Sequence, residues 1–128
     1  MADDSPKLTV RLETDAQGNP TVIHQDEQRR YKIVFEVENA PLDAYAATFE
    51  LDPSFSWDPV RMLPPESAGK FRLETTTYGD YPLVVRLHRA KAEDVVLKEG
   101  VARGLRRARE SMPGNAEIDT ALADIADH

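Results

Sequence analysis

The fold class is decided by residues 31–38, Tyr-Lys-Ile-Val-Phe-Glu-Val-Glu, in which apolar and charged residues alternate. A β-strand sends successive side chains to opposite faces, so the apolar residues share one face and the charged residues share the other. The apolar face consists of Tyr31, Ile33, Phe35 and Val37. A strand of this kind suits an antiparallel sheet that has one face on the core and one in water.

Four further stretches alternate in the same way. Their apolar stripes are Leu8, Val10 and Leu12; Tyr45, Ala47, Phe49 and Leu51; Phe71 and Leu73 with Thr75; and Leu83, Val85 and Leu87. A slip of one residue would turn the charged side chains of a strand into the core, so the pattern determines the registers. A further strand is expected near residues 21–25. Residues 56–69 contain Pro59, Pro64 and Pro65, and we expect an irregular loop there.

Composition narrows the class of protein. The chain has 128 residues, a formal net charge of −7 and no cysteine, which fits one domain in a reducing compartment. The acidic start Met1–Pro6 lacks the features of a signal peptide, and no apolar run reaches membrane-spanning length, so we expect a soluble, cytoplasmic protein. Its negative charge argues against general nucleic-acid binding, which requires a positive surface.

The chain changes character near residue 90. All nine aromatic residues lie in residues 1–90, which we expect to form the sandwich, and residues 91–128 are expected to form a helical extension. Apolar residues three and four apart predict one face of a helix: Leu97, Val101, Leu105, Ala108 and Met112. Gly100 and Gly104 weaken that helix by about 1 kcal/mol each relative to alanine, so a final strand near residues 95–97 stays open.

A second helix is predicted after Pro113-Gly114, which ends the first. Asn115 can cap this second helix, and its apolar side is formed by Ile118, Leu122 and Ile125.

Two aromatic loops carry a family resemblance. They contain Phe49-Glu50-Leu51-Asp52-Pro53-Ser54-Phe55 and, after Phe71, Tyr78-Gly79-Asp80-Tyr81. Together with the order of the strands over residues 8–88, these loops resemble the YEATS domain, and they are most similar to its bacterial branch. The resemblance implies an immunoglobulin-like antiparallel β-sandwich, here followed by one or two C-terminal helices.

The resemblance also implies a function. Members of this family recognise an acylated lysine of a protein tail by holding the flat acyl-amide between aromatic rings at one end of the sandwich. An aromatic ring packs well on a planar amide, and acylation removes the cost of burying an ammonium ion. Transferred to this chain, Phe55 and Tyr78 are the two rings, Ser54 is the hydroxyl that meets the amide, and the Gly79 N–H is a donor to the acyl carbonyl. Trp57 and Asp80 complete the expected ligand-binding set.

Asp52 stands where eukaryotic members have a histidine. An aspartate cannot stack on the acyl group or donate a hydrogen bond at neutral pH, so it favours a polar or cationic ligand. The bacterial members to which the chain is most similar occur alone or fused to signalling and defence modules. The resemblance therefore implies a non-enzymatic module whose ligand is an acyl-lysine peptide or another small planar molecule.

Each candidate residue also has a structural interpretation. Phe55 and Tyr78 can close the end of the sandwich, Trp57 can cover an edge of the core, and Tyr81, in phase with Leu83, is expected to lie in the core. Asp52 and Asp58, as a general acid–base pair, and Ser54 with His88, as a hydrolase pair, are disfavoured because loop aspartates usually cap turns and His88 is predicted to face solvent.

Other chemistry has little support in the sequence. His24, His88 and His128 share no metal-ligand spacing, and we expect neither a metal nor a cofactor. The arginines between residues 103 and 109 could contact nucleic acid or an acidic partner, but acidic residues follow at once, which favours pairing inside a helical hairpin or a solvated face. The alternative function is a structural adaptor that assembles with a partner, or with a second copy, through residues 91–128.

Overall fold

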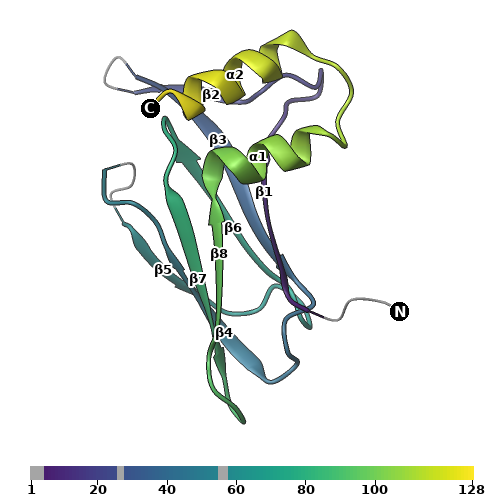
Figure 1. Ribbon diagram of the computed structural model, residues 1–128, viewed down its shortest axis with the longest axis vertical. Coiled ribbons are helices and arrows are strands. Elements are labelled where there is room, and N and C mark those ends of the chain that lie inside the picture. Colours follow the sequence, from purple (N-terminus) through teal and green to yellow (C-terminus); the bar gives the residue numbers. More distant parts are fainter. Residues whose placement is uncertain (1–4, 26–27, 55–57) are drawn as a thin grey trace.

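The computed structural model describes residues 5–25, 28–54 and 58–128, which form two antiparallel sheets and two helices (Figure 1). The strands are β1 Lys7–Leu12, β2 Val22–Gln25, β3 Gln28–Glu38, β4 Ala44–Glu50, β5 Val60–Leu63, β6 Phe71–Thr77, β7 Pro82–Arg89 and β8 Val95–Gly100. The helices are α1 Val101–Arg109 and α2 Ala116–Ala126. In the first sheet β3 pairs with β1, β2 and β6, and the second sheet has the order β5-β4-β7-β8.

The two sheets pack face to face, and their inward side chains form the core. The predicted stripes are buried on four strands, which confirms their faces: Val10 and Leu12 on β1; Tyr31, Ile33, Phe35 and Val37 on β3; Phe71 and Leu73 on β6; and Leu83, Val85 and Leu87 on β7. This arrangement is an immunoglobulin-like sandwich with two C-terminal helices, so the predicted fold class is confirmed.

The stripe on β4 was predicted with one error, at Tyr45. The pairing of β4 with β7 shifts register between Ala44 and Ala46, and both of these alanines are buried. A bulge places an extra residue in one strand and re-aims a side chain. Tyr45 is therefore exposed, and its ring lies beside that of His88.

The segment of residues 56–69 was predicted as irregular and contains a strand. The four residues of β5 pair with β4, with Glu50 opposite Val60 and Ala47 opposite Leu63. The pattern was hidden because Pro59 and Pro64 flank a strand of only four residues, and only the side chains of Val60 and Met62 point fully outward.

The region of residues 91–100, which the sequence left open, contains the final strand. β8 pairs with β7 along its whole length, with Gly100 opposite Pro82 at one end and Val95 opposite Leu87 at the other. The second sheet therefore continues beyond residue 90. Leu97 therefore belongs to a strand and not to the predicted helix, which begins at Val101. Met112 lies after the end of that helix and packs against the core.

Both helices lie at one end of the sandwich, with α1 against β1 (Figure 1). Their apolar residues join the sandwich core, including Val101, Leu105, Ile118 and Ile125. Gly104 explains how α1 approaches so closely, since a Cβ atom at this position would lie 2.9 Å from the Cβ and Cγ2 atoms of Val10. The glycine that weakens the helix is thus required by its packing.

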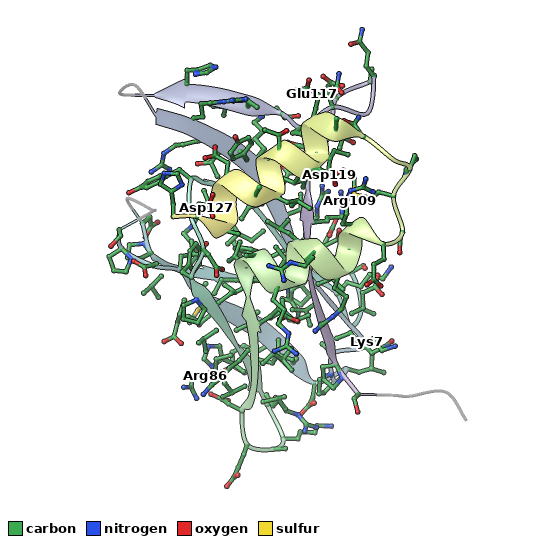
Figure 2. All side chains as sticks on the ribbon, turned by 45° about the horizontal axis from the view of Figure 1, so that its top comes forward. Lys7, Arg86, Arg109, Glu117, Asp119 and Asp127 are labelled. Carbon is green, nitrogen blue, oxygen red and sulfur yellow. The ribbon has the colours of Figure 1, made fainter. Side chains whose placement is uncertain are left out.

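The start of α2 follows the prediction. The Asn115 side chain accepts hydrogen bonds from the Glu117 N–H at 2.8 Å and the Ile118 N–H at 3.2 Å, which confirms it as the N-cap. The helical hairpin is closed by an ion pair between Arg109 and Asp119, with a distance of 2.8 Å between Nε and Oδ1 (Figure 2). The predicted pairing of the arginine run within the hairpin is confirmed at this position.

Candidate functional site

The two loops singled out by the sequence meet at one end of the sandwich. One loop follows β4, whose end pairs with the start of β7, and the other loop joins β6 to that start of β7. The Tyr78 hydroxyl donates a hydrogen bond to the Ser54 carbonyl oxygen at 2.9 Å. Residues 24 positions apart in the sequence are thus joined, and Tyr78 is held in one orientation.

Tyr78 is half-buried, and its ring has neighbours that the sequence did not indicate. The Arg30 guanidinium lies over the ring, 5.2 Å from its centroid, and the ring of His128 meets it edge-on at 6.5 Å. A cation over an aromatic face is attracted by the ring quadrupole. Arg30 is itself positioned, because its Nη1 donates to the Thr76 hydroxyl at 3.1 Å.

Asp52 organises the first loop. Its Oδ1 accepts a hydrogen bond from the Ser54 N–H at 2.8 Å, which is the turn-capping geometry typical of a loop aspartate. The Asp52 carboxylate also affects Tyr81. Burial raises the pKa of Tyr81 well above its ordinary value, and the negative charge of Asp52 raises it further. Tyr81 is buried in the core, as predicted.

Gly79 is buried, and its backbone groups are bound inside the loop. Its N–H donates to the Thr77 hydroxyl oxygen at 3.2 Å, and the same hydroxyl donates to the Gly79 carbonyl at 2.7 Å. The N–H that was expected to meet an acyl carbonyl therefore already has a partner. Thr77 is fully buried and was not identified from the sequence, where it reads as one of three consecutive threonines.

Asp80 connects the second loop to α1. Its Oδ1 accepts a hydrogen bond from the Ala102 N–H at 2.8 Å, and the neighbouring Tyr81 carbonyl accepts from the Val101 N–H at 2.9 Å. The first N–H groups of a helix have no partner within the helix, and a carboxylate there also interacts favourably with the helix dipole. The loop thus caps α1, whose N-cap residue, Gly100, has no side chain to do so.

The end of α2 is attached to the same part of the sandwich. The Tyr31 hydroxyl, on β3, donates to Asp124 Oδ2 at 2.6 Å. Burial and this hydrogen bond to a carboxylate raise the pKa of Tyr31 to about 12. Because Asp124 lies one turn before His128, this contact places the C-terminal histidine next to Tyr78. No sequence pattern links these residues, since their proximity depends on how α2 packs.

Two predicted site residues, Phe55 and Trp57, lie outside the described residues, so their assignment stays a prediction. Asp58 is exposed and forms an ion pair with Arg61 at 3.6 Å. His88 points outward from β7, as predicted, and pairs with Thr48 and not with Ser54. Its Nε2 lies 2.6 Å from the Thr48 hydroxyl and its Nδ1 lies 3.1 Å from Asp94 Oδ2.

Within the described ranges, no group of three or more histidine, aspartate or glutamate side chains is arranged to hold a metal ion. None of the helices in these ranges is long and apolar enough to span a membrane.

Comparison with known proteins adds a likeness to solved structures. No family model matches the sequence, and no curated protein matches it. Among solved structures, the chain is similar to the Yaf9 YEATS domain bound to H3K27ac, with a TM-score of 0.47 and 12% sequence identity. The similarity covers 91% of this chain and 82% of that one.

Proposed function

We propose that the protein is a non-enzymatic recognition module that binds an acylated lysine side chain of a peptide, or another small planar ligand, at the loop end of the sandwich. The observation that carries the proposal is the hydrogen bond from Tyr78 to the Ser54 carbonyl, which joins the two aromatic loops and fixes a half-buried ring at their junction. A fixed ring binds a planar group without losing the entropy of its own side chain.

The polar surroundings of the ring favour an amide over an ammonium group. The Arg30 guanidinium beside Tyr78 disfavours a second cation, whereas the carbonyl oxygen of an acyl-amide accepts hydrogen bonds from such a donor. Acylated lysine satisfies both conditions, and unmodified lysine does not. We assign stacking to Tyr78, and we keep the Ser54 hydroxyl as the polar contact.

The other residues of the predicted set take different roles in this proposal. Phe55 and Trp57 remain predicted aromatic contacts. Asp52, Gly79 and Asp80 shape the two loops through the hydrogen bonds described above. The resemblance to bacterial members is the support for placing this module in a cytoplasmic signalling or defence system.

The alternative function, an adaptor that assembles through the C-terminal helices, is not retained. It depended on apolar helical faces that the chain could not bury by itself. Ile118 and Ile125 of α2 and Leu105 of α1 are buried in the shared core, so these faces are already covered by the sandwich.

Isothermal titration with acetyl-lysine, crotonyl-lysine and unmodified lysine peptides tests the proposal. We expect saturable binding of the acylated peptides alone, lost in Tyr78→Ala and weakened in Tyr78→Phe, which retains the ring but not the hydrogen bond that fixes it. Tyr45→Ala is the matched control, because Tyr45 is exposed on a different surface. Equal binding of all three peptides, or binding that survives Tyr78→Ala, would overturn the proposal.

A further inference from the structure

Thr48, His88 and Asp94 form a hydrogen-bonded chain on the outward face of the sheet β5-β4-β7-β8. His88 lies between the other two, with its Nε2 2.6 Å from the Thr48 hydroxyl and its Nδ1 3.1 Å from Asp94 Oδ2. These residues come from β7, β4 and the turn before β8. A hydroxyl beside an imidazole that a third group orients is the arrangement that activates a nucleophile. The sequence did not indicate it, because nothing along the chain links Thr48 to His88.

The Asp94 carboxylate determines which ring nitrogen of His88 carries the proton. A carboxylate only accepts hydrogen bonds, so Nδ1 is the protonated nitrogen of the neutral ring. Nε2 then carries a lone pair, and the Thr48 hydroxyl donates its hydrogen to it. His88 is therefore placed to take the proton of Thr48, and Asp94 is a positioning residue.

The strand pairing gives Thr48 two different neighbours. Arg86 lies directly opposite it on β7, and Met62 lies directly opposite it on β5. Side chains in such pairs have Cβ atoms about 4.5–5.5 Å apart, and both neighbours are exposed. The apolar part of an acyl group on Thr48 can thus pack on Met62. The Arg86 guanidinium can donate to its carbonyl oxygen, where negative charge develops during attack.

The cluster is held in place and is accessible. The side chains of His88 and Asp94 are 18% and 37% exposed, and Thr48 is half-buried. The ring of Tyr45 lies 6.2 Å from that of His88 and packs beside it. The turn between β7 and β8 lies at the opposite end of the molecule from both helices, so neither helix covers the cluster (Figure 1).

We propose that Thr48 is a nucleophile that accepts an acyl group from an activated ester, with His88 as its general base. The Thr48 oxygen forms a bond to the carbonyl carbon, and His88 takes the hydroxyl proton. The bond from the carbonyl carbon to the leaving oxygen then breaks, and that oxygen receives the proton from His88. The products are an ester of Thr48 and a free alcohol. The step is independent of the ligand site, since Tyr78 and Ser54 lie on the end loops.

Reaction of the full chain with p-nitrophenyl acetate tests the proposal, with the acetylated residues mapped by peptide mass spectrometry. We expect acetylation of Thr48 to be at least about 100-fold faster than that of Thr120, an exposed threonine whose hydroxyl donates to the Ala116 carbonyl. His88→Gln should lower the rate at position 48 by a similar factor, and Thr48→Ser should retain it. His24→Gln is the matched control and should leave the rate unchanged, because His24 is exposed on β2.

Nitrogen-15 NMR of the imidazole ring provides a test that does not depend on reactivity. We expect the neutral ring of His88 to carry its proton on Nδ1 in the wild type and to lose this preference in Asp94→Ala, which should also react more slowly. A wild-type ring with the proton on Nε2 would overturn the proposal, because Thr48 would then accept a hydrogen bond and have no base. Acetylation of Thr48 that is no faster than that of Thr120, or that is unchanged in His88→Gln, would overturn it as well.

Discussion

The loop end of the sandwich differs from the outward face of the sheet β5-β4-β7-β8, which we call the open face, in how polar and apolar groups are used. At the loop end the chain binds itself, since Asp80 caps α1, Asp52 caps its own turn and Tyr31 holds α2 through Asp124. On the open face, side chains of both kinds point into solvent, including Met62 and Arg86. The side-chain hydrogen bonds described above thus stabilise the loop end, whereas the open face is not covered by another element of the described chain.

This difference limits what each region can recognise. At the loop end most of the hydrogen-bonding groups of the candidate site already have partners, so a ligand would be held mainly by stacking on the fixed Tyr78 ring. On the open face Thr48 and His88 bond to each other, whereas the large side chains of Val60 and Met62 are exposed. The two regions therefore differ in how much of their surface is already used by contacts within the chain.

The largest effect on stability is expected from truncating the core contact of α2. Ile125→Ala removes a fully buried side chain, and we expect it to lower the free energy of unfolding by about 2–5 kcal/mol. Met62→Ala on the open face should change it by less than about 0.5 kcal/mol. Urea denaturation measures both. Equal losses would mean that α2 does not pack on the sandwich as described.

A smaller loss is expected where α1 approaches β1. Gly104→Ala forces a methyl group against Val10, and we expect a destabilisation of about 1–3 kcal/mol, although alanine favours an isolated helix by about 1 kcal/mol. Gly114→Ala is the matched control, because its added Cβ meets nothing within 4 Å. If Gly104→Ala stabilises the protein in thermal denaturation, the close contact between α1 and β1 is incorrect.

The smallest of the three effects concerns the hydrogen bond between Tyr31 and Asp124. Tyr31→Phe removes the donor, and we expect a loss of about 1–2 kcal/mol at neutral pH. Tyr45→Phe, which changes an exposed tyrosine, should have no measurable effect. Urea denaturation of both variants gives the comparison.

Alkaline pH sharpens the same test. The pKa of Tyr31 is raised from 10.0 to about 12, so the folded state favours the neutral phenol. Its contribution to stability is complete below pH 10 and is lost as the pH rises through about 12. The raised pKa of Tyr81 also lowers stability at alkaline pH, but it does so equally in the wild type and in Tyr31→Phe and therefore cancels in their difference. The stability difference between the wild type and Tyr31→Phe should therefore shrink over this range, and a constant difference would contradict the assignment.

Alternation along the chain predicted the core well because it depends only on the period of a strand. The buried faces of β1, β3, β6 and β7 follow it directly. The bulge that exposes Tyr45 could not be read in this way, since it arises from how β4 pairs with β7. β5 was missed because a strand of four residues carries a weak periodic signal. β8 was left open because it ends at Gly100 and its apolar residues also fit the pattern of the following helix.

The site was predictable only in part, for a related reason. The aromatic loops can be recognised in the sequence, and their contact between Tyr78 and Ser54 follows from the order of the strands. The neighbours of Tyr78 cannot be read in this way. Arg30 and His128 reach the ring because of the register of β3 with β6 and the position at which α2 ends, and both are set by tertiary packing.

The most direct test of the proposed function is a heteronuclear NMR titration of the labelled protein with an acetyl-lysine peptide. Binding at the loop end predicts the largest amide shifts at Ser54, Tyr78 and Gly79, with no comparable shifts at Met62 or Val96. Saturable shifts centred on these loops, absent with the unmodified peptide, would support the assignment. Shifts confined to the open face, or no shifts at all, would contradict it.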